Sequence, residues 1–444
     1  MIEYAPYVLG GIAIGTVAGV LPGVGITIFL VLLFPFLLNA DPIGVVLLYV
    51  SMVSITQFTG SVTGIVFGVP GEVSSLPAVK EGHRLFLQGK GTLALAQTAI
   101  GSVVGSLLCV GFVFLIAGEL DKYAFFYSTY FQSVILVCVL AVIAFQATNH
   151  PVINCALMAI GYGLAMLGVN SLNSVDTITF GITDLLLGIP LFPVIVWLYV
   201  FPQILRNWST HDVKSTNVSS YRFGVWDNAR TYIENLGSSL RGTVIGFFFG
   251  FVPYLTTIIS ANLSYSIEVR LQKWRGRYSE QGDLPSLVSS ETANNAAALS
   301  SLLPLLLIGI PITTSEALLL EIVTAAGHIF YVEDFENLFY TVAVCLVFTN
   351  FIGLVLCWPL AHIITFWHRF PLSWIYSAII AICAGLTVYM GFVYNAVELY
   401  VYSSILFAGL GYALRKTDTI PLIFAFIMQD SLENNLTRLI FYML

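Results

Sequence analysis

Small hydroxyl and amide side chains gather where proline or glycine interrupts apolar segments of this 444-residue sequence. In a bilayer, such interruptions free backbone N–H and C=O groups, which are tolerated only inside protein or beside a water-filled cavity. The N-termini of the resulting half-helices can hold an anion, and the freed carbonyl groups can coordinate Na⁺. The candidate substrate- and ion-binding residues of the first half are Pro22, Gly23, Gly25, Thr27, Gln57, Thr59, Ser61, Thr63, Gly68, Pro70, Gly71, Glu72, Ser74 and Ser75. Those of the second half are Pro253, Tyr254, Thr256, Thr257, Asn294, Asn295, Gly309, Pro311, Thr313 and Thr314, and the hydroxyls of Ser260 and Ser315 belong to the same group.

No Lys or Arg lies in the interrupted segments, so an anion would be bound mainly by helix dipoles and hydroxyl groups. Simpler interpretations stand beside this one. Serine and threonine in membrane helices usually bond their own backbone, and glycines that recur every four residues often serve close helix packing. Glu72 is either a functional carboxylate or an N-terminal helix charge, whereas the paired amides of "ETANNAA" (291–297) favour a functional role because unpartnered amides are costly in a membrane.

Enzymatic and metal chemistry find little support in the sequence. The motifs HExxH and GxSxG do not occur, and no glycine-rich phosphate loop carries a lysine. The six cysteines form no CxxC pair, and the six histidines show no metal-ligand spacing. We therefore expect neither an enzyme nor an ATPase, no cofactor and no structural metal, and nothing in the sequence suggests a nucleic-acid partner.

Composition identifies the class of protein. Hydrophobic residues make up 58% of the chain, charged residues only 9%, and long apolar stretches recur throughout. Soluble domains carry about 25% charged residues. The sequence therefore predicts an all-α polytopic membrane protein with about 10–12 membrane elements. We expect an N-terminal membrane repeat (1–205), a cytoplasmic linker (206–241) and a C-terminal membrane repeat (242–444).

Loop charges predict sidedness, because Lys and Arg prefer the cytoplasmic side. Loops 77–92, 206–241 and 268–283 are basic, so we place them in the cytoplasm. The stretch 316–336 has Glu and Asp but no Lys or Arg, and we place it outside.

Two apolar segments are predicted to fold back as re-entrant hairpins. Segment 242–266 has basic loops on both sides, so it should enter and leave by one face. Segment 7–38 would be about 48 Å long as one helix, whereas the hydrocarbon core is about 30 Å thick. Folding at Pro22-Gly23 resolves the excess; a tilted, kinked single helix is the alternative.

An internal repeat links the interruptions. "GTVAGVLPG" (15–23) matches "GFFFGFVPY" (246–254) at an offset of 231, and "FGVPGEVSS" (67–75) matches "IGIPITTSE" (308–316) at an offset of 241. The loop after the second motif is basic in the first half and acidic in the second, which predicts inverted repeats, a construction common in secondary transporters.

The chain resembles the large membrane subunit of tripartite tricarboxylate transporters (TctA type). The similarity is carried by "GTVAGVLPGVG" (15–25), the stretch 68–102, "SYSIEVRLQKW" (264–274), "SETANNAAALSSLLPLLLIGIP" (290–311) and "PLIFAFIMQDSLENNLTRL" (421–439). The resemblance implies a permease that imports a (tri)carboxylate coupled to Na⁺ or H⁺ in a bacterial inner membrane. It also implies two protein partners, a small four-helix membrane subunit and a periplasmic solute-binding protein.

The chain departs from the family pattern at several positions. The usual "DGY" is "EGH" at Glu81-Gly82-His83, and the expected second-half Pro-Gly pairs are Pro253-Tyr254 and Pro311-Ile312. Thr256 replaces another expected glycine. These changes favour one alternative to a transporter, a non-transporting membrane scaffold or receptor with the same fold.

Overall fold

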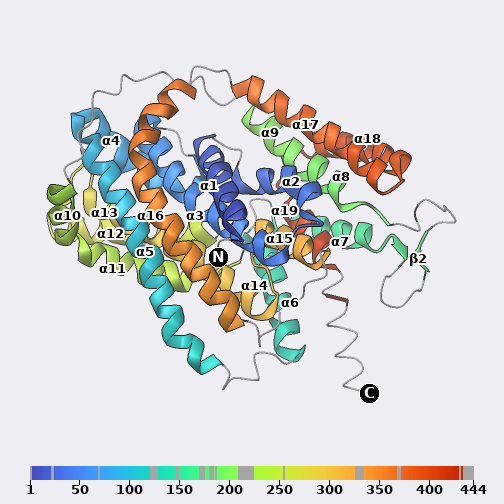
Figure 1. Cartoon of the computed structure of the whole chain (residues 1–444), viewed down its shortest axis with the longest axis horizontal. Coiled ribbons are helices and arrows are strands. Elements are labelled where there is room, and N and C mark those ends of the chain that lie inside the picture. Colours follow the sequence, from blue (N-terminus) through green and yellow to red (C-terminus); the bar gives the residue numbers. More distant parts are fainter. Residues whose placement is uncertain are drawn as a thin grey trace.

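A computed structural model of the chain describes residues 3–21, 25–68, 71–120, 129–146, 150–169, 176–179, 185, 188–208, 225–253, 256–325, 335–367, 372–429 and 432–433. The described part is almost entirely helical, which confirms the predicted all-α membrane fold (Figure 1). The exception is a short antiparallel ribbon of β1 (Gly168–Val169) and β2 (Asp176–Ile178). The candidate residues Pro22, Gly23, Pro70 and Tyr254 lie outside the described residues.

The first predicted hairpin is formed by α1 (Ala5–Val20) and α2 (Gly25–Leu37). The 16 and 13 residues of these arms are about 24 and 20 Å long, too short to cross a hydrocarbon core of about 30 Å. The two ends of the segment also lie together: the backbone N–H of Asp41 donates to the hydroxyl of Tyr7 at 3.2 Å. Asp41 then caps the next helix through Gly44 at 2.8 Å. Segment 7–38 is therefore a hairpin and not one kinked helix.

The second hairpin comprises α11 (Leu236–Phe249) and α12 (Thr256–Trp274). Its base is closed by an ion pair between Arg241 and Glu268, whose N···O distance is 2.8 Å. The hydroxyl of Ser238 donates to the same carboxylate at 2.9 Å. A residue at the start of the segment thus contacts one at its end, which confirms the predicted fold-back of 242–266.

Each hairpin packs on a long buried helix that ends in a break. These helices are α3 (Pro42–Phe67) in the first half and α13 (Leu284–Ser300), continued by α14 (Leu302–Ile308), in the second. After the breaks come the short elements η1 (Val73–Ser75), η2 (Ala78–Gly82), α4 (His83–Leu85) and η3 (Phe86–Lys90) in the first half, and α15 (Thr314–Ala325) in the second. Long apolar helices follow in both halves, α5 (Gly91–Leu120) and α16 (Phe335–Trp367).

The remaining helices complete the fold. Of these, α7, α8 and α18 lie at the opposite end of the view from α11–α13, whereas α10 packs against α5 and α11 (Figure 1). The remaining helices are α6 (Thr129–Gln146), α7 (Pro151–Ala165), α8 (Leu191–Ile195), η6 (Val196–Val200), α9 (Phe201–Asn207), α10 (Val225–Glu234), α17 (Leu372–Val393), α18 (Val397–Ala413) and α19 (Ile420–Ile427). The segment predicted as a linker, 206–241, contains α10 and the start of α11 in its described part.

The glycines repeated in the sequence make equivalent helix contacts in the two halves of the structure. Gly11, Gly15 and Gly19 of α1 lie against the backbone of α3 at Leu48, Met52 and Thr56. Gly242, Gly246 and Gly250 of α11 lie against α13 at Ser289, Ala293 and Ala297. The glycines differ by 231 in number and their partners by 241, the offsets found in the sequence. Each pair of helices therefore packs through equivalent residues, which supports a duplication; the inverted orientation of the copies stays a prediction.

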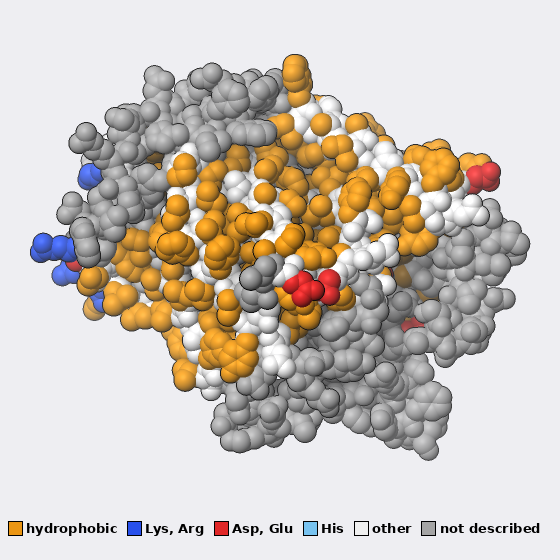
Figure 2. Space-filling model, in the orientation of Figure 1, with side chains coloured by type: hydrophobic (Ala, Val, Ile, Leu, Met, Phe, Trp, Pro, Cys, Tyr) orange, Lys and Arg blue, Asp and Glu red, His pale blue; other side chains and the backbone are white. Residues whose placement is uncertain are grey.

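The outer surface is apolar, as contact with lipid requires. Figure 2 shows hydrophobic side chains across most of the described face, with Lys and Arg gathered at one edge. Outward residues of the long helices, such as Leu115, Phe351 and Phe392, are 62–78% exposed. Among the described residues, four helices are long and apolar enough to cross a membrane, and six shorter apolar helices accompany them.

The two basic loops predicted to share the cytoplasmic side lie against each other. Arg84 donates to the carbonyl of Glu280 at 3.2 Å, and Gln88 bonds the carbonyl of Gln281. Loops 77–92 and 268–283 therefore belong to one face of the molecule, although α12 extends through the first residues of the second loop.

Inverted repeats predict that the hairpin bases face opposite sides of the membrane. Asn39 and Arg275 are both exposed at these bases. Single cysteines there, in a chain without the exposed Cys138 and Cys155, should react with an impermeant maleimide from opposite faces. Reaction of both from one face would show parallel repeats instead.

The close glycine contacts predict a steric limit. A Cβ at Gly246 would lie 2.8 Å from Cα of Ala293, so Gly246→Ala should force the helices apart and cost about 1–3 kcal/mol. The matched control is Gly409→Ala, because a Cβ there meets nothing within 4 Å. Thermal unfolding in detergent should show a lower midpoint for the first variant only; equal midpoints would contradict the packing described here.

Candidate functional site

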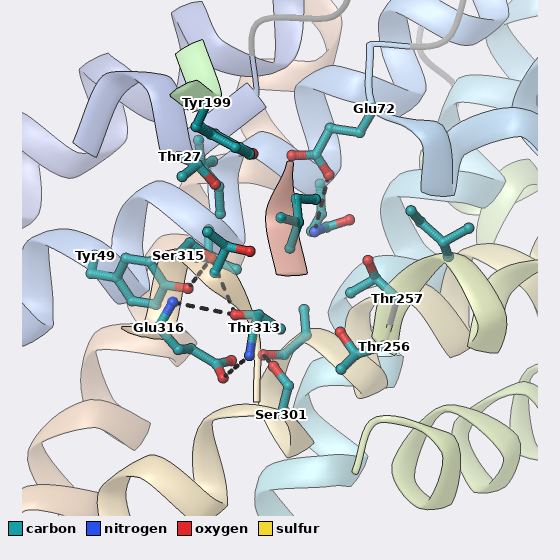
Figure 3. Close-up of a pocket in the computed structure, with 17 residues that line it drawn as sticks. Thr27, Tyr49, Glu72, Tyr199, Thr256, Thr257, Ser301, Thr313, Ser315 and Glu316 are labelled. Atoms are coloured by element: carbon teal, nitrogen blue, oxygen red, sulfur yellow. Dashed lines mark hydrogen bonds between the residues drawn. The ribbon is translucent and has the colours of Figure 1, made fainter. Parts of the chain in front are cut away.

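A cavity of about 210 Å³ lies where the hairpins meet the two breaks. The first hairpin contributes the start of α2, and the second contributes the start of α12 (Figure 3). The rest of the wall comes from α3, the first break, the end of α13, the second break with the start of α15, and side chains of η6 and α19. The lining residues are Ile26, Thr27, Tyr49, Val53, Gln57, Glu72, Tyr199, Thr256, Thr257, Ile258, Ala298, Ser301, Thr313, Thr314, Ser315, Glu316 and Ile420.

The first break begins at a glycine in the left-handed region. Gly68 ends α3 with φ +67°, which reverses the chain at low steric cost. Four residues later Glu72 presents its carboxyl group to the cavity. Its hydrogen bonds are long, because Gln57 Nε2 and Ser74 Oγ both lie 3.4 Å from Oε2.

The second break also begins at a left-handed glycine, but its carboxyl group comes seven residues after that glycine instead of four. Gly309 ends α14 with φ +67°, and Thr313 and Glu316 then form a capping box at the start of α15. The carboxylate of Glu316 accepts from the backbone N–H groups of Ile312 and Thr313 at 3.0 and 3.1 Å. The backbone N–H of Glu316 donates in return to Oγ1 of Thr313 at 3.3 Å.

A hydroxyl pair joins the central helix of one half to the break of the other. Oη of Tyr49, on α3, lies 2.8 Å from Oγ of Ser315, on α15 (Figure 3). Ser315 also lies 3.3 Å from Oγ1 of Thr313. The wall opposite Glu72 is therefore an ordered row of hydroxyl groups.

Two helix N-termini open onto the cavity. The first turns of α2 and α12 line it through Thr27 and Thr257. A helix N-terminus carries about half a positive charge and unpaired N–H groups, which favours an anion. The N-terminus of α15 differs, because a carboxylate lies there: Glu316 accepts from the N–H groups of Ile312 and Thr313, just before the helix.

The structure brings many of the candidate residues together. Those that line the cavity are Thr27, Gln57, Glu72, Thr256, Thr257, Thr313, Thr314 and Ser315. Gly25, Gly68, Gly71, Ser74, Ser75, Pro253, Gly309 and Pro311 belong to the described parts of the hairpin tips and breaks without lining the cavity.

Other candidates are buried away from the cavity and partnered. Thr59 and Thr63 donate to their own helix and to the carbonyls of Gly15 and Gly19. Ser61 donates to Glu291 at 2.5 Å. In the amide pair, Asn294 bonds Gln57 behind the wall, and Asn295 bonds Ser102 at 2.8 Å.

Sequence reasoning missed several lining residues. Tyr49, Tyr199 and Ser301 occur in or beside helical segments with no local sign of a site. Glu316, the first residue of the stretch predicted to lie outside, is 1% exposed and caps α15. The side of the membrane on which 316–336 lies stays a prediction. The capping-box pattern T-x-x-E at Glu316 was readable in "TTSE".

Glu81-Gly82-His83, the motif that differs from the family's usual "DGY", packs beside the first break on the side away from the cavity. The buried carboxylate of Glu81 accepts from Tyr265 Oη at 2.6 Å and from the backbone N–H of Asp283 at 2.9 Å. Nδ1 of His83 lies 2.8 Å from the carbonyl oxygen of Ile65, near the end of α3. These residues thus position the wall without lining the cavity.

Comparison with known proteins extends over almost the whole chain. The profile of the Tripartite tricarboxylate transporter TctA family matches residues 6–424. A protein of Agrobacterium vitis, described as "Uncharacterized 52.8 kDa protein in TAR-I ttuC' 3'region", is 25% identical over 435 residues, covering 96% of this chain and 85% of the relative. No solved structure matches the chain.

The paired left-handed glycines predict unequal costs of substitution. A Cβ at Gly309 would meet nothing within 4 Å, so Gly309→Ala should cost only the left-handed strain of about 1–2 kcal/mol. At Gly68 a Cβ would also lie 2.8 Å from the ring of His83. Thermal unfolding should therefore show a larger loss for Gly68→Ala; an equal loss would show that the His83 contact carries no constraint.

Proposed function

Because the chain belongs to the tripartite tricarboxylate transporter TctA family, we propose that it is a permease that imports a small carboxylate across a bacterial inner membrane. One observation carries the proposal. The first turns of the equivalent helices α2 and α12 meet at one cavity, whose lining includes no Lys or Arg among the described residues. Such a cavity binds an anion through dipoles and hydroxyl groups.

The size of the cavity favours a small acid. Pockets for drug-sized ligands have volumes of about 300–1,000 Å³, and this one is about 210 Å³. Hydroxyl groups of Thr27, Thr257 and Thr313 face it from three helix starts and can donate to carboxylate oxygens.

Transport would require a coupling cation and protein partners. Two carboxyl groups, Glu72 and Glu316, line the cavity, so an anion gains from a cation that enters with it. We propose Na⁺ or H⁺ as that cation, a periplasmic solute-binding protein as the donor of substrate and a small four-helix membrane subunit as the companion. The hairpins would move past the other helices as a paired unit.

Reconstitution tests the function directly. Proteoliposomes would contain this chain with the small membrane subunit, and the binding protein encoded beside it would be added with radiolabelled citrate. We expect accumulation of citrate that depends on the binding protein and on a Na⁺ or H⁺ gradient. Absence of uptake with a panel of di- and tricarboxylates, despite binding-protein docking, would favour the scaffold or receptor instead.

Substitution of the hydroxyls at the helix starts should weaken transport. Thr27→Val and Thr257→Val each remove one donor while keeping volume, at a cost of about 0.5–1.5 kcal/mol, or roughly 2- to 12-fold in KM. Thr341→Val is the control, because Thr341 is exposed on α16 and bonds its own helix. A normal KM for both cavity variants would place the substrate elsewhere.

A further inference from the structure

Glu72 and Glu316 line one cavity but differ in how their carboxyl groups are supported. The carboxylate of Glu316 accepts two backbone hydrogen bonds and sits at a helix N-terminus, an arrangement that stabilises its charge. Among the described residues, the carboxyl group of Glu72 has only the two side-chain contacts at 3.4 Å, and no Lys or Arg among them lines the cavity beside it. An ionised carboxylate with so little compensation is costly, so the neutral form is favoured at Glu72.

The side chains around Glu72 also fail to stabilise a negative charge on it. Tyr49, Tyr199 and Glu316 are the titratable side chains that share the cavity with it. Helix α12 contributes only hydroxyl and apolar groups to this wall, and on α13 the carboxylate of Glu291 is engaged by Ser61. No described neighbour that lines the cavity therefore supplies positive charge.

A network behind the wall fixes the amide that faces Glu72. Nδ2 of Asn294 donates to Oε1 of Gln57, so Gln57 presents its N–H₂ group to Glu72. A neutral Glu72 can accept this hydrogen bond with its carbonyl oxygen and keep its own O–H free to donate. Glu72 lines the cavity, so this O–H is available to a substrate bound there (Figure 3).

We propose that Glu72 carries the coupling proton and donates it in a hydrogen bond to the substrate carboxylate. The proposal rests on the proposed function and assigns its coupling step to one residue. A proton and an anion then bind together: the neutral acid attracts the carboxylate, and loss of the proton leaves two anions that repel each other. Because the coupling is reciprocal, bound anion also strengthens binding of the proton.

Proton uptake on citrate binding tests the linkage. Above the pH at which Glu72 titrates in the free chain, calorimetry in two buffers of different ionisation enthalpy should give an uptake of about one proton per citrate, and Kd should rise about tenfold per pH unit. Below that pH Glu72 is already neutral, so citrate binding should take up no proton at this residue. Glu72→Gln, which is permanently neutral and keeps an N–H donor, should take up no proton and bind independently of pH. In proteoliposomes it should exchange citrate but lose accumulation driven by a pH gradient.

The matched control is Glu316→Gln, because glutamine also serves in a capping box and removes the other carboxyl group. Whatever its affinity, this variant should keep the proton uptake. Proton uptake on citrate binding that persists in Glu72→Gln, or that disappears in Glu316→Gln, would overturn the assignment. Coupling of wild-type accumulation to Na⁺ alone would overturn it as well.

A second measurement needs no substrate. Infrared difference spectra of the purified chain between acid and alkaline pH should show a protonated carboxyl band that Glu72→Gln removes and Glu316→Gln keeps. A band unchanged in Glu72→Gln contradicts the proposal. If citrate does not bind at any pH, the proposed function fails for that substrate, and the infrared result still decides the protonation of Glu72.

Discussion

A helix that stops inside a bilayer leaves backbone N–H and C=O groups that only the protein can satisfy. This constraint explains why the interruptions of this chain meet in one place. Gly68 and Gly309 reverse the chain at the two breaks. In the first break the hydroxyl of Ser75 donates to the backbone carbonyl of Glu72 at 2.7 Å. In the second, the carboxylate of Glu316 accepts from the two backbone N–H groups that follow Pro311. Backbone groups that remain at the starts of α2 and α12 then border the cavity, where an anion can use them.

Close glycine packing fixes each hairpin against its own central helix. Each hairpin lies on its central helix through backbone contacts that a single Cβ would disturb, so the tip of the hairpin is held at a fixed position along that helix. The two halves share this geometry but differ in side chains. At the repeat offset of 241, Glu72 of the first half is equivalent to Thr313 of the second, and Ser75 of the first half is equivalent to Glu316. The two halves thus share the backbone geometry of the site, and each carries one carboxyl group in a different setting.

The sequence predicted the backbone features better than the wall of the cavity. Hairpins and breaks follow from segment length, proline and left-handed glycine, which are local properties. Thr59 and Thr63 looked like site residues, but they face α1 and bond its carbonyls, because a helix directs successive residues to different neighbours. Tyr199 and Ile420 reach the cavity from distant helices, and only tertiary packing brings them there.

The cavity offers an anion dipoles and hydroxyl groups, and no fixed positive charge on its described wall. A bidentate arginine would bind a carboxylate strongly in every state of a transport cycle, and its charge could not be withdrawn. Helix dipoles bind more weakly, so the sign of one nearby carboxyl group can decide whether the anion stays. Glu316 cannot serve in this way, since its carboxylate is committed to the cap of α15. Glu72 lacks such a commitment and lines the same cavity, so in the proposed transport a change of its charge would act directly on the anion.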